Sequence, residues 1–113
     1  MTTIYHNPRC TKSRETLAIL EEKNEDITIV KYLETPLTEQ KLREIISLLG
    51  IPPIDLVRKN EAVWKEKFKT KKLSDDEIIK AMSEHPKLIE RPIVIKDSKA
   101  IIGRPPQKVI DIL

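Results

Sequence analysis

The spacing of apolar residues changes along the chain and predicts the order of its strands and helices. A short β-prone run at Thr2–Tyr5 is followed by helical spacing from about residue 11 to 23. Residues 27–33 form an apolar run typical of a buried strand. The first part of the chain therefore has the order strand, helix, strand.

The middle of the chain shows helical patterns only. Ser74 and Glu77 have the Ser-x-x-Glu spacing of a capping box, in which each side chain satisfies a free backbone N–H at a helix start. Gly50 is suited to end the helix before it, and Pro86 ends the last helix of this stretch. The predicted helices cover about residues 37–49, 52–57, 61–69 and 74–84.

Two apolar triplets near the carboxyl end, at residues 93–95 and 100–102, predict strands joined through Asp97-Ser98 as a hairpin. Pro105 suits the first turn of a final helix. The chain thus ends in the order strand, strand, helix.

These elements predict an α/β fold. A strand–helix–strand start pairs parallel strands through a right-handed crossover, and a hairpin adds antiparallel partners. We expect a single domain, 1–113, with a four-stranded mixed sheet and flanking helices. A helical insertion at about 37–86 separates the second strand from the third.

Composition is that of a globular domain. Of 113 residues, 39% are hydrophobic and 35% charged, enough for one hydrophobic core and too few for two. The formal net charge of +3 is small and mixed along the chain, so no nucleic-acid partner is expected. The chain start lacks the apolar core of a secretory signal, and no apolar run approaches the roughly 18 residues of a membrane span. We expect a cytoplasmic protein without a membrane partner.

One basic stretch surrounds Trp64 and Phe68. Its regular lysines favour a solvated helix face, with the aromatic side packed inward, over a nucleic-acid site. The lysines concerned are Lys65, Lys67, Lys69, Lys71 and Lys72.

Cys10 is the only cysteine, so the chain cannot form an internal disulfide, and the two histidines lie too far apart in sequence to suggest a metal site. A lone cysteine is often a buried, inert residue. Cys10, however, lies between Arg9 and Lys12 at the predicted turn from strand to helix, where a core side chain is not expected. We therefore predict a reactive thiol.

Ionisation of this thiol requires more than a helix end. A free cysteine has a pKa near 8.5, so only a few per cent is thiolate at neutral pH. Lowering the pKa by about two units takes roughly 2.7 kcal/mol, whereas a helix amino terminus supplies about 0.3–1 kcal/mol, up to about 2. Nearby cations and the hydroxyl of Ser13 can supply the rest. The cations near the thiol in sequence are His6, Arg9, Lys12 and Arg14.

The segment Ile4-Tyr5-His6-Asn7-Pro8-Arg9-Cys10-Thr11-Lys12-Ser13-Arg14 resembles the active-site segment of the glutaredoxin-linked arsenate reductases. The similarity continues at residues 32–36, 57–60, 89–94 and 103–105, so it covers essentially the whole chain. That family has a thioredoxin-like fold with an inserted helical region, and the resemblance implies the same fold here.

The resemblance also implies roles for particular residues. The cysteine matching Cys10 attacks the oxyanion, and three arginines hold it, which here are Arg58, Arg91 and Arg104. Arginine forks suit this task because they bind oxyanions bidentately and neutralise the charge that would repel a thiolate. Pro92 matches a proline that is expected to follow a cis peptide bond. The matches that support the thiolate are His6, Ser13 and Arg14.

The implied reaction is reduction of arsenate to arsenite through a thioarsenate adduct on Cys10. Glutathione would be the co-substrate and glutaredoxin the reducing partner, with no metal and no tightly bound cofactor. Ser13 stands where a dithiol oxidoreductase has its second cysteine, so the second thiol must come from outside the chain.

Two other functions stay open. A glutathione-binding thiol oxidoreductase, or a reductase of another oxyanion, would use the same thiol and cations. A redox-related regulator on this fold would bind RNA polymerase, and such proteins use a Cys-x-x-Cys switch that Ser13 does not complete.

Overall fold

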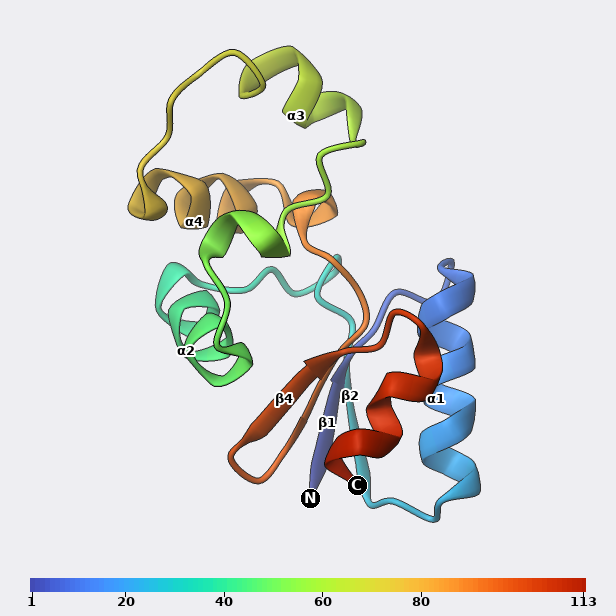
Figure 1. The fold of residues 1–113 in the computed structure, drawn as a ribbon. Helices are drawn as coiled ribbons and strands as arrows, with labels where there is room; N and C mark the ends of the chain where they lie inside the picture. The colour runs from blue at the N-terminus through green and yellow to red at the C-terminus, as the bar shows by residue number, and fades with distance from the viewer. The chain divides into compact units, whose positions relative to one another are not determined.

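The computed structural model describes residues 1–113, which group into two compact units (Figure 1). Residues 1–35 and 91–113 form the first unit, and residues 36–90 form the second. The predicted helical insertion therefore corresponds closely to the second unit. That the chain is one domain stays a prediction.

A four-stranded mixed sheet, in the order β2-β1-β3-β4, forms the first unit together with its helices (Figure 1). β1 (Thr2–Tyr5) pairs in parallel with β2 (Ile27–Val30) and antiparallel with β3 (Ile93–Lys96), which pairs antiparallel with β4 (Lys99–Ile102). α1 (Thr11–Glu22) is the crossover between the two parallel strands. The predicted fold class, a mixed four-stranded sheet with flanking helices and a helical insertion after the second strand, is confirmed.

The core of the first unit joins the sheet to α1 and to η3, the 3-10 helix Pro106–Ile112. Ile4, Leu20, Val94 and Val109 are each 0% exposed and come from β1, α1, β3 and η3. Burial of such side chains contributes about 1.5–3 kcal/mol each. This cluster fixes α1 against the sheet, and with it the amino-terminal end of the helix.

The second unit is helical. Its core contains residues that are 0% exposed, including Leu42, Ile45 and Met82. An antiparallel bridge between Val57 and Ile89 joins the two ends of the segment 57–89. Its elements are α2 (Glu39–Leu49), η1 (Pro53–Leu56), α3 (Ala62–Lys67), α4 (Asp75–Glu84) and η2 (Pro86–Leu88).

The helix boundaries predicted from capping residues are confirmed. The Ser74 hydroxyl accepts the Glu77 N–H at 3.3 Å, and the Glu77 carboxylate accepts the Ser74 N–H at 3.0 Å, so both halves of the capping box form. Gly50 ends α2 in the left-handed region at φ 67°, which glycine adopts without steric cost.

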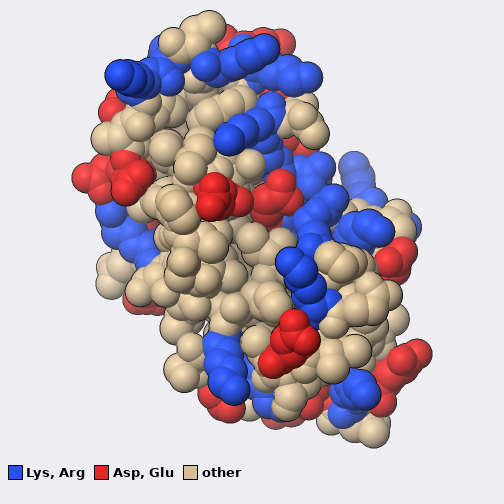
Figure 2. Space-filling view, in the orientation of Figure 1, with Lys and Arg blue, Asp and Glu red and all other residues tan.

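The lysine-rich segment has its charges on the surface. Figure 2 shows Lys and Arg side chains gathered over α3 and the chain that follows it. Trp64 is only 8% exposed and the lysines of this segment are exposed, as predicted, but only Lys65 and Lys67 lie within the helix. No helix of the structure combines the length and apolar character that crossing a membrane requires.

Three elements differ from the sequence predictions. β2 stops at Val30 because the Lys31 carbonyl accepts the N–H groups of Glu34 and Thr35, both at 3.0 Å, which turns the chain. The strand is also half exposed, since it lies at the sheet edge. The helix expected over 61–69 is shorter, at Ala62–Lys67. The final helix is of the 3-10 type and follows Pro105 instead of including it.

Candidate active site

Cys10 is the N-cap residue of α1 and has an extended backbone, with φ −91° and ψ 123°. Its N–H donates to the Asn7 carbonyl at 3.0 Å, and its own carbonyl accepts the Arg14 N–H at 3.0 Å as the helix begins. The N–H groups of the first helical turn have no partner within the helix and are available to an anion at its end. The partly exposed thiol lies at this position.

The surroundings of the Cys10 sulfur hold the pKa of the thiol below its ordinary value. Partial burial raises this pKa, because burial disfavours the charged form. Hydrogen bonds from the Ser13 N–H, the Arg91 guanidinium and the Lys12 N–H lower it, and the Arg91 charge lowers it further. The structure therefore favours the thiolate, and one of the arginines expected to hold the oxyanion also contacts the sulfur.

The Ser13 hydroxyl faces His6 and the loop, whereas the thiol receives the Ser13 N–H. Ser13 Oγ lies 2.6 Å from His6 Nδ1 and accepts the Asn7 N–H at 3.1 Å. Burial, followed by the charges of Lys31 and Arg14, lowers the pKa of His6 and so favours the neutral ring. In the structure His6 and Ser13 join the loop to α1, and their support of the thiolate stays a prediction.

Arg14 binds the same loop. Its Nη1 donates to the Pro8 carbonyl at 3.2 Å and its Nη2 to Thr11 Oγ1 at 3.3 Å. These contacts hold the guanidinium at the surface beside the first turn of α1. Support of the thiolate by Arg14 stays a prediction.

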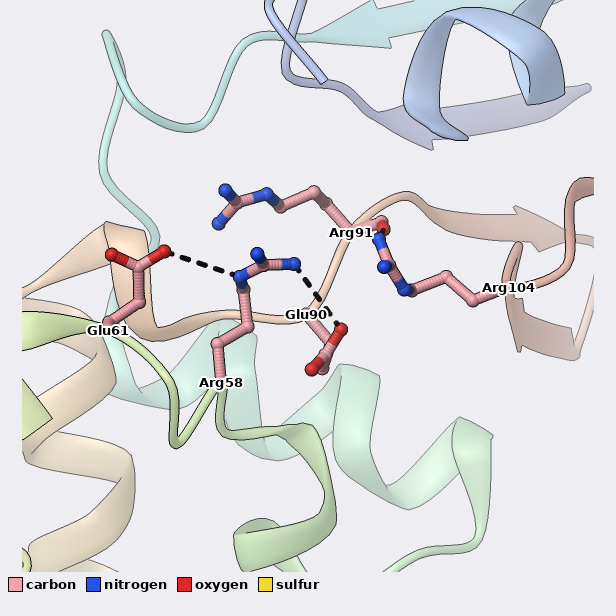
Figure 3. A network of polar contacts seen from close by, with 5 residues as sticks. All are labelled: Arg58, Glu61, Glu90, Arg91 and Arg104. Carbon is pink, nitrogen blue, oxygen red and sulfur yellow. Dashed lines mark hydrogen bonds and ion pairs between the residues drawn. The ribbon is translucent and has the colours of Figure 1, made fainter. Parts of the chain in front are cut away.

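Arg91 and Arg104 are brought together by β3 and β4. Arg104 Nη1 donates to the Arg91 carbonyl at 3.2 Å, and Figure 3 shows the Arg104 side chain reaching toward the Arg91 backbone. The Arg91–Pro92 peptide bond is cis, as the resemblance implies, and so is the Arg104–Pro105 bond, which the sequence did not indicate.

Gly103 allows the closest packing in this region. A Cβ at Gly103 would lie 2.6 Å from Thr16 Oγ1 and 2.9 Å from Pro92 Cγ, both too short for ordinary contacts. The Gly103 N–H donates to the Pro92 carbonyl at 2.9 Å. Glycine is therefore required at position 103, where the chain leading to Arg104 passes close to Pro92 and to Thr16 of α1.

Arg58 belongs to the second unit, where two carboxylates hold it. Its Nε lies 3.4 Å from Glu61 Oε1 and its Nη1 3.7 Å from Glu90 Oε2. Figure 3 marks both ion pairs with dashed lines. The Arg58 N–H also donates to the Leu88 carbonyl at 2.7 Å, beside the bridge between Val57 and Ile89. Its role in holding an oxyanion stays a prediction from the resemblance.

Sequence reasoning found Cys10 but missed how the thiol is held. The sequence does not show that Arg91 reaches the sulfur, because the two residues are distant along the chain and meet only through the pairing of β1 with β3. No three His, Cys, Asp or Glu side chains gather in a way that could hold a metal ion.

Similar proteins of known family show which family this chain belongs to. The sequence pattern of the ArsC family matches residues 5–112. The arsenate reductase of Haemophilus influenzae is 46% identical over 97% of this chain and 97% of that protein. The arsenate reductase of Escherichia coli K12 is 41% identical over 98% of this chain and 79% of that protein. The structure of an arsenate reductase from Vibrio cholerae, 46% identical, matches with a TM-score of 0.94 over 99% of this chain and 97% of that one. The chain belongs to the ArsC family.

Proposed function

We propose that the protein reduces arsenate to arsenite, with Cys10 as the nucleophile. The observation that carries this proposal is the sulfur itself, to which two backbone N–H groups and the Arg91 guanidinium donate hydrogen bonds. These contacts lower the thiol pKa and so raise the fraction of thiolate, the nucleophilic form of cysteine. The arsenate reductases among its relatives support arsenate as the oxyanion.

In the first step, the thiolate attacks arsenic and displaces hydroxide, so a sulfur–arsenic bond forms as an arsenic–oxygen bond breaks. Both reactants are negative, and their approach therefore requires positive charge. Arg91 supplies it beside the sulfur, and Arg104 is held at the Arg91 backbone. By the resemblance, Arg58 completes the set of arginines.

Reduction of arsenate to arsenite takes two electrons. Two thiols that become a disulfide supply two electrons, but the chain has a single cysteine. The second thiol must therefore come from another molecule. We take it to be glutathione, with glutaredoxin restoring the reduced state, as the resemblance implies.

A coupled assay tests the proposal. With glutathione, glutaredoxin and glutathione reductase present, NADPH should be consumed only when arsenate is added. Cys10→Ser should abolish this arsenate-dependent consumption. Lys108 is exposed and is not among the groups that act on the thiol, so Lys108→Ala should keep the activity. Folded protein without arsenate-dependent NADPH consumption would refute the function. A mixed disulfide of Cys10 with glutathione, without any effect of arsenate, would instead indicate a thiol oxidoreductase with another substrate.

A further inference from the structure

We propose that a cavity at the loop leading to Cys10 is the binding site for glutathione, which it holds by the charged groups of the peptide. This inference rests on the proposed function, because glutathione enters as the second thiol. The cavity has a volume of about 410 Å³, within the range of about 300–1,000 Å³ typical of small-molecule sites. Two segments of the first unit line it, residues 6–9 after β1 and residues 31–34 after β2.

One wall of the cavity is the loop that leads to the reacting sulfur. Asn7 lines the cavity, and its carbonyl accepts the Cys10 N–H at 3.0 Å. Arg9 also lines it and directly precedes Cys10. His6 forms part of the same wall and is tied to α1 by its 2.6 Å contact with Ser13. A ligand in the cavity therefore contacts the segment that positions the thiol.

The charged side chains of the cavity are presented by ordered turns. The Lys31 carbonyl accepts the Glu34 N–H at 3.0 Å, so residues 31–34 make one helix-like turn. Residues three apart in such a turn project to the same side, which places the Lys31 and Glu34 side chains together. In the opposite wall, Asn7 Oδ1 accepts the Arg9 N–H at 3.0 Å and fixes the loop as an Asx turn.

The charges complement those of glutathione. Arg9 and Lys31 are exposed cations of the lining, and Glu34 is its exposed carboxylate. Glutathione at neutral pH has two carboxylates and one ammonium, so each charged group can meet one of opposite sign. Leu33, 37% exposed, offers an apolar contact for the rest of the peptide. Arsenate has no cationic group and would be repelled by Glu34, so the cavity suits the thiol peptide better than the oxyanion.

The test uses S-methylglutathione, whose blocked sulfur allows binding without redox chemistry, and follows the backbone amide NMR signals of the protein. Binding should shift the signals of His6, Asn7 and Arg9 and those of residues 31–34. Lys31→Ala should weaken the affinity about two- to fivefold, the range for an exposed ion pair. The matched control is Lys23→Ala, an exposed lysine at the end of α1 and outside the cavity lining, which should bind as the wild type does.

A second variant tests the carboxylate. Glu34→Gln should weaken S-methylglutathione binding but not that of its N-acetyl derivative, which lacks the ammonium. Shifts confined to other segments, or equal affinities for Lys31→Ala and Lys23→Ala, would overturn the assignment. Arsenate is absent from these experiments, so they stand apart from the coupled assay. Activity without binding in this cavity refutes only the cavity, and binding here without arsenate-dependent activity refutes only the function.

Discussion

Replacing Arg91 with alanine should reduce the ionisation of Cys10. The Arg91 guanidinium donates a hydrogen bond to the sulfur and adds a positive charge beside it, and both lower the thiol pKa. The N–H groups of Lys12 and Ser13 belong to the backbone, so they remain in the variant. The change therefore isolates the side-chain contribution to the stability of the thiolate.

The size of the effect follows from this one contact. A hydrogen bond to a charged group contributes about 1.5–3 kcal/mol. Because Cys10 is partly exposed, solvent screening reduces this to about 1–1.5 kcal/mol. A difference of about 1.4 kcal/mol is about tenfold in an equilibrium constant. At a pH below the wild-type pKa, Arg91→Ala should therefore have about one tenth of the thiolate.

The assay is the ultraviolet absorbance of the thiolate against pH, with the rate of iodoacetamide alkylation as a second readout. Arg91→Lys should fall between wild type and Arg91→Ala, because it keeps the charge but loses the planar fork. Arg43→Ala is the matched control, since Arg43 lies on α2 and pairs with Asp76 at 2.7 Å. If Arg91→Ala titrates as the wild type does, or if Arg43→Ala shifts the titration equally, the reasoning is wrong.

Three further variants test the supporting structure. Ser13→Ala should shift the Cys10 titration less than Arg91→Ala does, because the Ser13 N–H is kept, and should lower the free energy of unfolding by about 1–3 kcal/mol, since the hydroxyl bonds two buried groups. Gly103→Ala should cost about 1–3 kcal/mol in denaturant unfolding, because a Cβ has no room there, and an unchanged midpoint would contradict this. Glu25 has a pKa below its ordinary value because Lys96 and Thr2 donate hydrogen bonds to it. A lowered folded-state pKa gives stability that is present above the unfolded pKa of about 4.3 and lost as the pH falls through the folded pKa. Glu25→Gln should therefore be less stable than the wild type at neutral pH but not in acid, and a difference that persists in acid would argue against it.

Much of the fold could be predicted because local signals agree with it. The capping box at Ser74 and the left-handed Gly50 mark helix ends that the structure confirms. β2 was predicted too long, because its apolar run continues into Tyr32, which is buried although it lies outside the strand. Periodicity alone cannot separate a strand residue from a buried turn residue.

In the candidate site, Cys10 could be singled out from the sequence, whereas most of its contacts could not. Cys10 could be found because cations surround it at a predicted helix start. The groups that contact the Cys10 sulfur depend on tertiary contacts and on which atom of each residue faces it. The spacing of residues along the sequence does not show either. Ser13 is the clearest example, since the hydroxyl was expected to reach the thiol but contacts His6, while the backbone N–H contacts the sulfur.

The central claim is that one thiol is held ionised by surrounding positive charge and reacts with a small oxyanion. The most direct measurement is the pH dependence of Cys10 alkylation, with and without arsenate. We predict a midpoint below the value of about 8.5 for a free cysteine, and slower alkylation when arsenate is present. A midpoint near 8.5, together with an alkylation rate that arsenate leaves unchanged, would contradict both parts of the claim.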